Sequence, residues 1–317
     1  MQRPTINAVS VLSDKELDQY LEKISVLVIM EQTFTALSQG QVAQPAQSLT
    51  LFPQNRGDVI TYQGVLSHVD VFGAKLSPYI ATDSAPIITA WTILMSMKTG
   101  QPLLICDSGR LTRERTAATT ALAIDKLARK ESKILALIGT GAIGLAHLKH
   151  VLALRDWQEI RIYSPDLALN QSKQTQFKAL DDRISLCDSN QACIDDADVI
   201  MLCTSSGKPV IDVKQLRKPA LITSISTNIA QAHEIDPALL STLDVYCDDK
   251  KTTPHSAGEM VLAAQQHQWS ADKIVGDLAD LCCHQCPEPS YQKSVFFRSI
   301  GLGIEDIAIA YAIYQQI

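Results

Sequence analysis

The sequence lacks any apolar run as long as a membrane-spanning helix requires, which is about 18 residues or more. Its first residues, Met1 to Thr5, also lack the apolar core of a secretory signal peptide. An excess of positive charge is missing too, because 28 Lys and Arg residues face 34 Asp and Glu residues, for a net charge of −6. Nucleic acid and anionic membranes are therefore not expected as partners. We expect a cytoplasmic protein.

Internal repeats and low-complexity segments are absent as well. Hydrophobic residues make up 46% of the chain and charged residues 20%, an ordinary balance for a globular protein. With 317 residues the chain is long enough for two domains, each with a sizeable apolar core.

The eight cysteines show no spacing typical of a disulfide framework. The cluster Cys282-Cys283-His284-Gln285-Cys286 invites a metal interpretation, yet it lacks a second ligand pair at a recognisable distance along the chain. We therefore predict reduced thiols in a loop or helix end, and no metal site.

The strongest local pattern is a glycine-rich turn inside a strand-turn-helix-strand unit. An apolar run at 134–138 predicts a buried strand, residues 145–154 a helix, and residues 160–163 the next strand. Between the first strand and the helix stands a G-x-G-x-x-G motif, which in this context predicts a dinucleotide site with the phosphates at the helix N-terminus. Its residues, which we assign to cofactor binding, are Gly139, Thr140, Gly141, Ala142, Ile143 and Gly144.

The residues at the end of the second strand do not decide whether the cofactor is NAD(H) or NADP(H), which carries a 2′-phosphate. An acidic residue at Ser164 would favour NAD(H), and an arginine nearby would favour NADP(H), but neither is present. Asp166 could still reach the ribose hydroxyls, whereas Ser164 with Asn170 or Lys173 could accept a 2′-phosphate. We expect NAD(H) or NADP(H), with Ser164 and Asp166 in the site.

The remaining patterns predict an α/β protein. One long helix is expected at 13–37, short extended runs and turns between 48 and 106, and a linking helix at 111–129. After residue 134, strands and helices alternate, which is typical of a Rossmann-type doubly wound parallel sheet. The earlier hairpin-rich region predicts a mixed or antiparallel sheet, and the closing helix at 301–314 is expected to return to that first domain.

Several segments together resemble the ornithine cyclodeaminase/μ-crystallin family. They are DSGRLTRERTAA at 107–118, Ala197 to Ile200, Glu234 to Asp236, and FRSIGLGIED at 297–306. The match extends over nearly the whole chain in the same order. The resemblance implies a homodimer with a substrate and dimerisation domain at 1–116 and 298–317, an α/β domain built from both chain ends. It also implies an NAD(P)-binding Rossmann domain at 117–297.

The resemblance further implies hydride transfer between the nicotinamide and the α-carbon of a small imino or amino acid. Arg115 matches the family's carboxylate-binding arginine and Lys75 its active-site lysine. An arginine suits this role because its planar guanidinium can meet a carboxylate through two hydrogen bonds. A salt bridge on the linking helix is the alternative role for Arg115, and a solvated sheet edge is the alternative place for Lys75.

Two positions depart from the family pattern. Gln47, in the Gln44-Pro45-Ala46-Gln47 segment, replaces an arginine that usually supports the substrate carboxylate. Asn228 replaces an aspartate found in cyclodeaminases and alanine dehydrogenases. Cyclodeamination needs a carboxylate to take a proton from the second amine, and an amide cannot do so. Asn228 therefore favours imine reduction, unless it is merely a turn residue at a strand end.

These assignments lead to an expected function. We predict NAD(P)H-dependent reduction of Δ1-pyrroline-2-carboxylate to L-proline, with Δ1-piperidine-2-carboxylate to L-pipecolate as a second reaction. The alternatives are an ornithine cyclodeaminase, which converts L-ornithine to L-proline and ammonia, an amino-acid dehydrogenase acting on alanine or arginine, and a non-enzymatic NADPH-binding protein of the μ-crystallin type. Tyr62 is expected to orient the imine or a water molecule. Further cofactor-binding residues are assigned at Thr116, Thr204, Ser205, Ser226, Ser299 and Gly301.

Overall fold

The computed structural model describes residues 9–82, 84–227 and 231–317. The chain divides into two compact units, the first ending at Arg115 and including Leu302–Ile317, and the second spanning Thr116–Gly301. Residues 298–301, which the sequence prediction put in the first domain, belong to the second unit because they continue a strand of its sheet. Among the described residues, no helix combines the length and apolarity needed to cross a membrane.

The first unit is built on a mixed sheet of eight described strands, in the order β1-β8-β7-β5-β4-β2, with β3 beside β4 and β6 beside β5. Only the β1–β8 pair is parallel among the described pairs of this sheet, so the prediction of a mixed sheet is confirmed. Its elements are β1 (Ser10–Leu12), α1 (Asp14–Leu21), α2 (Val26–Ser38), β2 (Val42–Ala43), β3 (Ser48–Leu51), β4 (Gly57–Leu66), β5 (Val71–Ile80), β6 (Ile87–Ile88), β7 (Trp91–Ser96), β8 (Pro102–Asp107) and α10 (Gly303–Tyr314).

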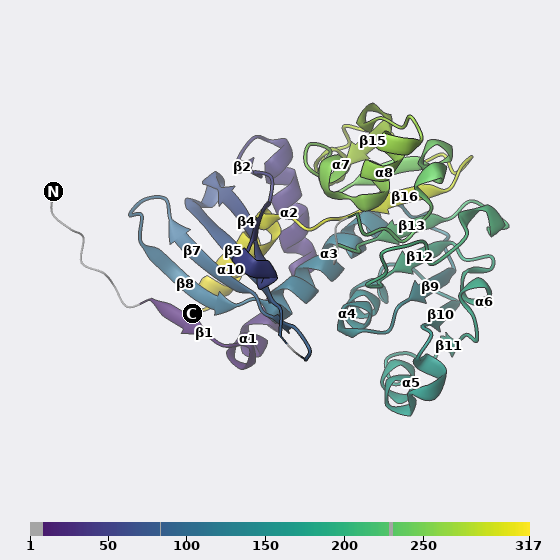
Figure 1. Cartoon of the computed structure of the whole chain (residues 1–317), viewed down its shortest axis with the longest axis horizontal. Helices are drawn as coiled ribbons and strands as arrows, with labels where there is room; N and C mark the ends of the chain where they lie inside the picture. The colour runs from purple at the N-terminus through teal and green to yellow at the C-terminus, as the bar shows by residue number, and fades with distance from the viewer. Residues whose placement is uncertain (1–8, 83, 228–230) are drawn as a thin grey trace. The chain divides into compact units, whose positions relative to one another are not determined.

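Helix α10, the yellow helix of Figure 1, packs across β4 and β5 of this sheet. Gly64 of β4 permits the close approach, because a Cβ there would lie 2.9 Å from the Cα of Ile304. The sheet register aligns Tyr62 of β4 with Lys75 of β5. The first turn of α10 is thereby brought to the row of side chains that includes Lys75.

The single helix predicted for 13–37 is wrong. The structure has α1 and α2 separated at Glu22 to Ser25, and Ser25 takes an extended conformation (φ −95°, ψ 99°) as the N-cap of α2. Serine is a preferred residue at this position. The apolar spacing continues through the break, so periodicity alone conceals it.

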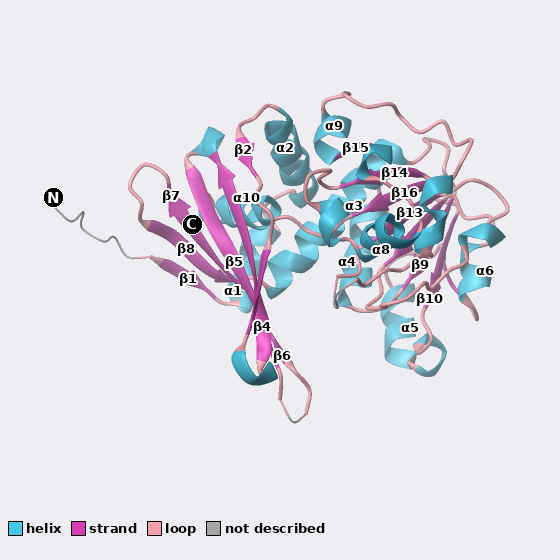
Figure 2. Ribbon diagram, turned by 45° about the horizontal axis from the view of Figure 1, so that its top comes forward, coloured by secondary structure: helices cyan, strands magenta, loops and turns pink. Residues whose placement is uncertain are grey.

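The second unit holds a parallel sheet with the strand order β11-β10-β9-β12-β13-β16-β14-β15, drawn in magenta in Figure 2. Every described pair in it is parallel, which confirms the doubly wound prediction. Its elements, with helix α3 entering from the first unit, are α3 (Gly109–Leu127), β9 (Ile134–Ile138), α4 (Ala142–Val151), β10 (Glu159–Tyr163), α5 (Gln171–Lys178), β11 (Ile184–Leu186), α6 (Asn190–Ile194), β12 (Val199–Leu202), β13 (Leu221–Ser224), β14 (Asp244–Cys247), α7 (Thr253–Ser256), α8 (Gly258–Gln266), β15 (Ile274–Asp277), α9 (Leu278–Cys282) and β16 (Val295–Arg298).

The strand order reverses at β9. The chain moves from β9 outward to β10 and β11, then crosses back to β12 on the other side of β9. Right-handed crossovers in opposite directions put helices on opposite faces, which leaves a crevice at the carboxyl ends of β9 and β12. Ligands of open parallel sheets bind at such a switch point.

Candidate active site

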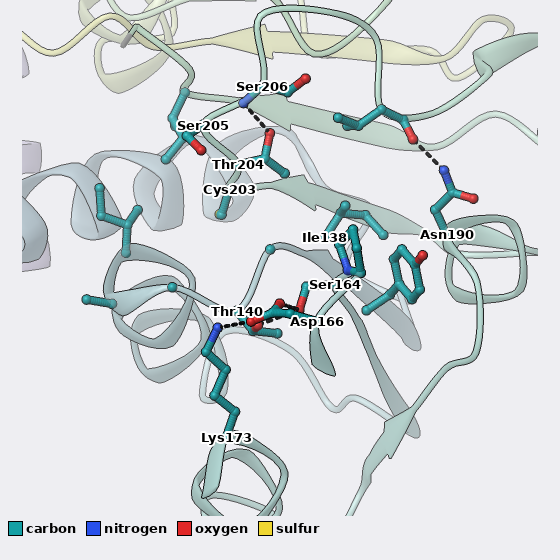
Figure 3. A pocket seen from close by; sticks show the side chains of 18 residues that line it. Ile138, Thr140, Ser164, Asp166, Lys173, Asn190, Cys203, Thr204, Ser205 and Ser206 are labelled. Atoms are coloured by element: carbon teal, nitrogen blue, oxygen red, sulfur yellow. Dashed lines mark hydrogen bonds and ion pairs between the residues drawn. The ribbon is translucent and has the colours of Figure 1, made fainter. Parts of the chain in front are cut away.

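A cavity of about 670 Å³ opens at this switch point. Its walls come from the glycine turn, the end of β10, and the loops that follow β12 and β13 (Figure 3). The lining residues are Ile138, Gly139, Thr140, Gly141, Ala142, Ile143, Tyr163, Ser164, Pro165, Asp166, Lys173, Asn190, Cys203, Thr204, Ser205, Ser206, Val210 and Ile225.

Each of the three motif glycines is suited to its position for a different geometric reason. Gly139 has φ +110°, and a Cβ there would lie 2.3 Å from the carbonyl oxygen of Cys203. A Cβ on Gly144 would lie 2.2 Å from the carbonyl oxygen of Gly139. At Gly141, by contrast, a Cβ would meet no atom within 4 Å, so this glycine keeps open the space in which a pyrophosphate approaches the helix N-terminus.

A chain of polar contacts runs from the glycine turn to helix α5 along one wall of the cavity. The hydroxyls of Thr140 and Ser164 are 2.6 Å apart, and Ser164 donates to Oδ1 of Asp166 over 2.7 Å. Lys173, in the first turn of α5, forms an ion pair with Oδ2 of Asp166 (Figure 3). The pKa of Asp166 is lowered by this hydrogen-bonded lysine and by Ser164.

Glu234 forms hydrogen bonds with the loops that line the other side of the cavity. Its Oε1 accepts from the backbone N–H and the hydroxyl of Thr204, at 2.9 and 2.6 Å. Its Oε2 accepts from the Ser224 hydroxyl and from the backbone N–H groups of Ile225 and Ser226. Burial raises the pKa of Glu234, while the hydrogen bonds from Thr204 and Ser224 oppose that rise. This one carboxylate therefore fixes the loops after β12 and β13 together.

A second group of charged side chains lies inside the first unit. Lys75 Nζ is 2.8 Å from Asp306 Oδ2 and 3.3 Å from the hydroxyl of Thr112. Arg115 donates from Nε to Asp306 Oδ1 (3.2 Å) and from Nη1 to Glu305 Oε2 (3.0 Å). All four charged residues are at most 5% exposed, so two cations and two carboxylates share one buried cluster.

Burial and charge shift the acid–base behaviour of this cluster. Burial, followed by the nearby Arg115, lowers the pKa of Lys75 to about 8, although Asp306 opposes this shift. Burial would lower the pKa of Arg115 as well, but the carboxylates of Asp306 and Glu305 outweigh it and raise that pKa. The Tyr62 ring centroid lies 4.2 Å from Lys75 Nζ, and burial raises the pKa of its hydroxyl. At neutral pH the lysine keeps its charge above an aromatic face.

The structure brings together Lys75, Arg115 and Tyr62 from the predicted substrate set. Gln47 directly precedes β3, whose first residue, Ser48, pairs with the neighbour of Tyr62. The side-chain oxygen of Gln47 is buried and accepts no hydrogen bond from the described residues. Asn228 lies outside the residues that the structure describes.

The predicted cofactor residues are only partly gathered around the cavity. Gly139 to Ile143, Ser164, Asp166, Thr204 and Ser205 line it. Gly144 packs beneath the turn, and Ser226 donates its hydroxyl to the carbonyl of Ser206. Asp248 accepts hydrogen bonds from Ser299 and Gly301, and Thr116 is a buried residue of α3. The five predicted cofactor residues outside the cavity wall are Gly144, Thr116, Ser226, Ser299 and Gly301.

Three acidic residues with clear structural roles received no role in the sequence analysis. Glu305 and Asp306 open an otherwise apolar helix, and Glu234 precedes a turn. Two carboxylates at the start of an apolar helix are a signal for buried ion pairs, because charged residues are seldom buried unless they are paired. Among the described residues, no cluster of His, Cys, Asp and Glu is arranged to hold a metal.

The model of the ornithine cyclodeaminase/mu-crystallin family matches residues 7–317. The chain belongs to this family. It is 52% identical, over 96% of both chains, to the NAD(P)H-dependent anabolic L-arginine dehydrogenase DauB of Pseudomonas aeruginosa. It is 25% identical to Delta(1)-pyrroline-2-carboxylate reductase of Colwellia psychrerythraea, over 97% of this chain and 99% of the relative.

Solved structures of other proteins share the fold. The Thermococcus litoralis Delta(1)-pyrroline-2-carboxylate reductase, solved with NADH and L-proline, superimposes with a TM-score of 0.88 over 97% of both chains at 22% identity. An archaeal alanine dehydrogenase with bound NAD gives a TM-score of 0.85 over 97% of this chain and 95% of its own.

Proposed function

We propose that this protein forms L-arginine by NAD(P)H-dependent reduction of the imine of the corresponding 2-oxo acid. At the coarser level, the chain is an NAD(P)-dependent oxidoreductase acting on imino or amino acids. The observation that carries the finer proposal is the 52% identity to an L-arginine dehydrogenase across almost the full length of both chains. The prediction of a pyrroline-2-carboxylate reductase becomes the second candidate, because its support is a relative at 25% identity.

The buried cluster fits the common chemistry of these reactions. A bound nicotinamide supplies the hydride that the α-carbon receives. Arg115 is held by Glu305 and Asp306 through Nε and Nη1, and we assign the Nη2 edge to the substrate carboxylate. Lys75 supplies a second positive charge for the same carboxylate. Fixed charges of this kind position the imine, and positioning contributes much of the rate of hydride transfer.

The identity of residue 47 is compatible with a substrate that carries a cationic side chain. An arginine at this position would repel a guanidinium, whereas the buried amide oxygen of Gln47 can accept a hydrogen bond from one. Arginine carries such a group and Δ1-pyrroline-2-carboxylate does not. The uncharged Gln47 is therefore compatible with a cationic substrate, in a place where the resemblance implies an arginine beside the substrate carboxylate.

The second unit is proposed to hold the cofactor in the 670 Å³ cavity. Gly141 leaves room for the pyrophosphate, and the helix N-terminus of α4 supplies backbone N–H donors. Thr204, which Glu234 holds through two hydrogen bonds, and the adjacent Ser205 are assigned to the nicotinamide half. Thr116, Ser226, Ser299 and Gly301 are assigned to the support of that half.

A homodimer is proposed from the exposed apolar side chains of the first sheet. Large exposed apolar groups of this kind mark interaction surfaces. They belong to β3, β5, β6 and β7, and are Leu49, Leu51, Leu76, Tyr79, Ile80, Ile87, Ile88 and Trp91. Light scattering of the purified protein is expected to give twice the mass of the chain, and Ile88→Asp to shift the equilibrium towards the monomer. A monomeric wild-type protein would refute this proposal.

A substrate panel tests the function. Purified protein is supplied with NADH or NADPH, ammonium, and the 2-oxo acids of arginine and alanine. Separate samples receive NADH or NADPH with Δ1-pyrroline-2-carboxylate, which is the cyclic form of the 2-oxo acid of ornithine, or the oxidised cofactor with L-ornithine and no added ammonium. We expect the highest kcat/KM with the 2-oxo acid of arginine. A higher value for Δ1-pyrroline-2-carboxylate would select the second candidate. Ammonia release from L-ornithine would select a cyclodeaminase, and cofactor binding without any turnover a binding protein.

A further inference from the structure

Two side chains of opposite charge meet on the cavity wall at the end of β10. Asp166 follows the strand and Lys173 reaches it from α5, and both line the cavity (Figure 3). The Asp166 side chain is 56% exposed and that of Lys173 31% exposed. Both groups can therefore contact a molecule that enters the cavity.

In a Rossmann fold, residues at this place, just after the second strand, contact the adenosine ribose of the cofactor. An acidic residue after the second strand accepts hydrogen bonds from the ribose hydroxyls of NAD(H), and a cation nearby accommodates the 2′-phosphate of NADP(H). Here both kinds of group are present and bound to each other. A carboxylate alone would repel the phosphate, and a lysine alone would offer no acceptor to the hydroxyls.

We propose that Asp166 and Lys173 form an exchangeable pair that lets this cavity bind both NAD(H) and NADP(H). With NAD(H), Asp166 accepts from the ribose hydroxyls and Lys173 stays on Asp166. With NADP(H), Lys173 leaves Asp166 and pairs with the 2′-phosphate. The inference rests on the nicotinamide cofactor of the proposed function and adds the residues that decide its phosphate state.

The surrounding contacts favour such an exchange. An ion pair this exposed is screened by solvent and contributes little stability, so separating it costs little. Asp166 keeps a second partner when Lys173 leaves, because Ser164 donates to its other oxygen over 2.7 Å. The backbone of Lys173 is held by the Asn170 side chain, which accepts its N–H over 3.0 Å. The exchange therefore needs only a side-chain rotation of Lys173.

Equilibrium binding of NADH and NADPH to the full chain tests the proposal. The measurement uses the fluorescence of the bound reduced nicotinamide and contains no amino-acid or oxo-acid substrate. Failure of the arginine assay and failure of this proposal are thereby distinguishable. The quantity compared is the ratio of the Kd for NADPH to the Kd for NADH.

The two substitutions are expected to move that ratio in opposite directions. Lys173→Ala removes a charged partner of the phosphate and should raise the ratio about tenfold. Asp166→Asn removes the repelling charge and should lower the ratio about tenfold, with weaker binding of NADH. Lys178→Ala, an equal change of charge on the exposed face of α5 outside the cavity wall, should leave the ratio within about twofold of the wild type.

A ratio unchanged in Lys173→Ala, or shifted in the same direction by both substitutions, would overturn the proposal. Wild-type protein that binds only one of the two cofactors would overturn it as well. An equal effect of Lys178→Ala would reduce the role of Lys173 to general attraction and would also count against the pair.

Discussion

Lys75 of β5 and Asp306 of α10 form an ion pair of 2.8 Å in which both side chains are 1% exposed. Lys98 and Asp70, in the same unit, form a pair of the same length with side chains 74% and 46% exposed. The two pairs differ in burial and in their neighbours, since Arg115 also contacts Asp306. Burial makes the loss of one partner costly, because the remaining charge stays in a place that water hardly reaches.

Asp306→Asn is expected to reduce the free energy of unfolding by about 3 kcal/mol, since it leaves two buried cations with only Glu305. Urea denaturation measures this change. Asp70→Asn is the matched control and should leave the denaturation midpoint where it is. Equal stability of the two variants would contradict the account of the cluster.

The pKa of about 8 for Lys75 gives the reaction a pH dependence. Below that pH the lysine is charged, as its proposed role of attracting the substrate carboxylate requires. Above it the charge is lost, so kcat/KM for imine reduction should fall as the pH rises through about 8. The Lys75→Gln variant should show weak residual activity without this fall, as measured by initial rates across the pH range. A fall of the same size in Lys75→Gln would assign it to another group.

Tyr62 is expected to sustain the charge of Lys75 through its ring rather than through its hydroxyl. A cation over an aromatic face gains about 0.5–2 kcal/mol, which corresponds to a pKa shift of roughly 0.4–1.5 units. Tyr62→Leu should therefore move the alkaline fall in kcat/KM to lower pH, and Tyr62→Phe should keep it in place. If Tyr62→Phe lowers kcat/KM strongly at every pH while the fall stays at the same pH, the hydroxyl has a direct role instead.

Substitution of two motif glycines is expected to impair two different properties, the stability of the fold and the binding of the cofactor. Gly144→Ala should destabilise the protein, because its Cβ would lie 2.2 Å from the carbonyl oxygen of Gly139. Gly141→Ala should fold with an unchanged melting temperature, since its Cβ meets no atom within 4 Å, yet it should weaken NADH binding about tenfold or more by obstructing the pyrophosphate. Thermal denaturation and cofactor titration separate the two effects. Normal cofactor affinity in Gly141→Ala would contradict the assignment of the cavity.

Glu234 is expected to act on cofactor binding through the loops that it fixes. In Glu234→Gln one carboxylate oxygen is replaced by an NH₂ group, which would face the N–H or hydroxyl donors that now bind that oxygen. The lost hydrogen bonds should cost about 1–3 kcal/mol of free energy. The Kd for NADH should rise about tenfold as the Thr204 and Ser226 loops loosen. Glu131→Gln, on the surface of the same unit, serves as the control. An unchanged Kd in Glu234→Gln would show that the loops keep their positions without this carboxylate.

Much of the lining of the cavity in the second unit was predictable from the sequence because its constraints are local. The tight turn at Gly139 and the close packing at Gly144 require glycine within a few residues of a buried strand, and that spacing is visible in a single segment. Asp166 and Lys173, which also line the cavity, could be named for the same reason, since both follow the next strand within ten residues.

The buried charged cluster of the first unit was only partly predictable because it depends on tertiary contacts. Lys75 and Arg115 were found through the family resemblance, but their carboxylate partners, Glu305 and Asp306, lie near the other end of the chain. No periodicity links a strand in the first unit to the helix that returns to it. Strands β1, β15 and β16 were not predicted either.

The most direct test of the account follows the hydride itself. The protein is given NADPH or NADH carrying deuterium at the transferable position of the nicotinamide, together with ammonium and the 2-oxo acid of arginine, and the product is examined by NMR and mass spectrometry. We predict L-arginine with one deuterium on its α-carbon. Arginine without that deuterium would contradict the proposed reaction, as would the absence of arginine while a parallel sample given Δ1-pyrroline-2-carboxylate forms deuterated proline.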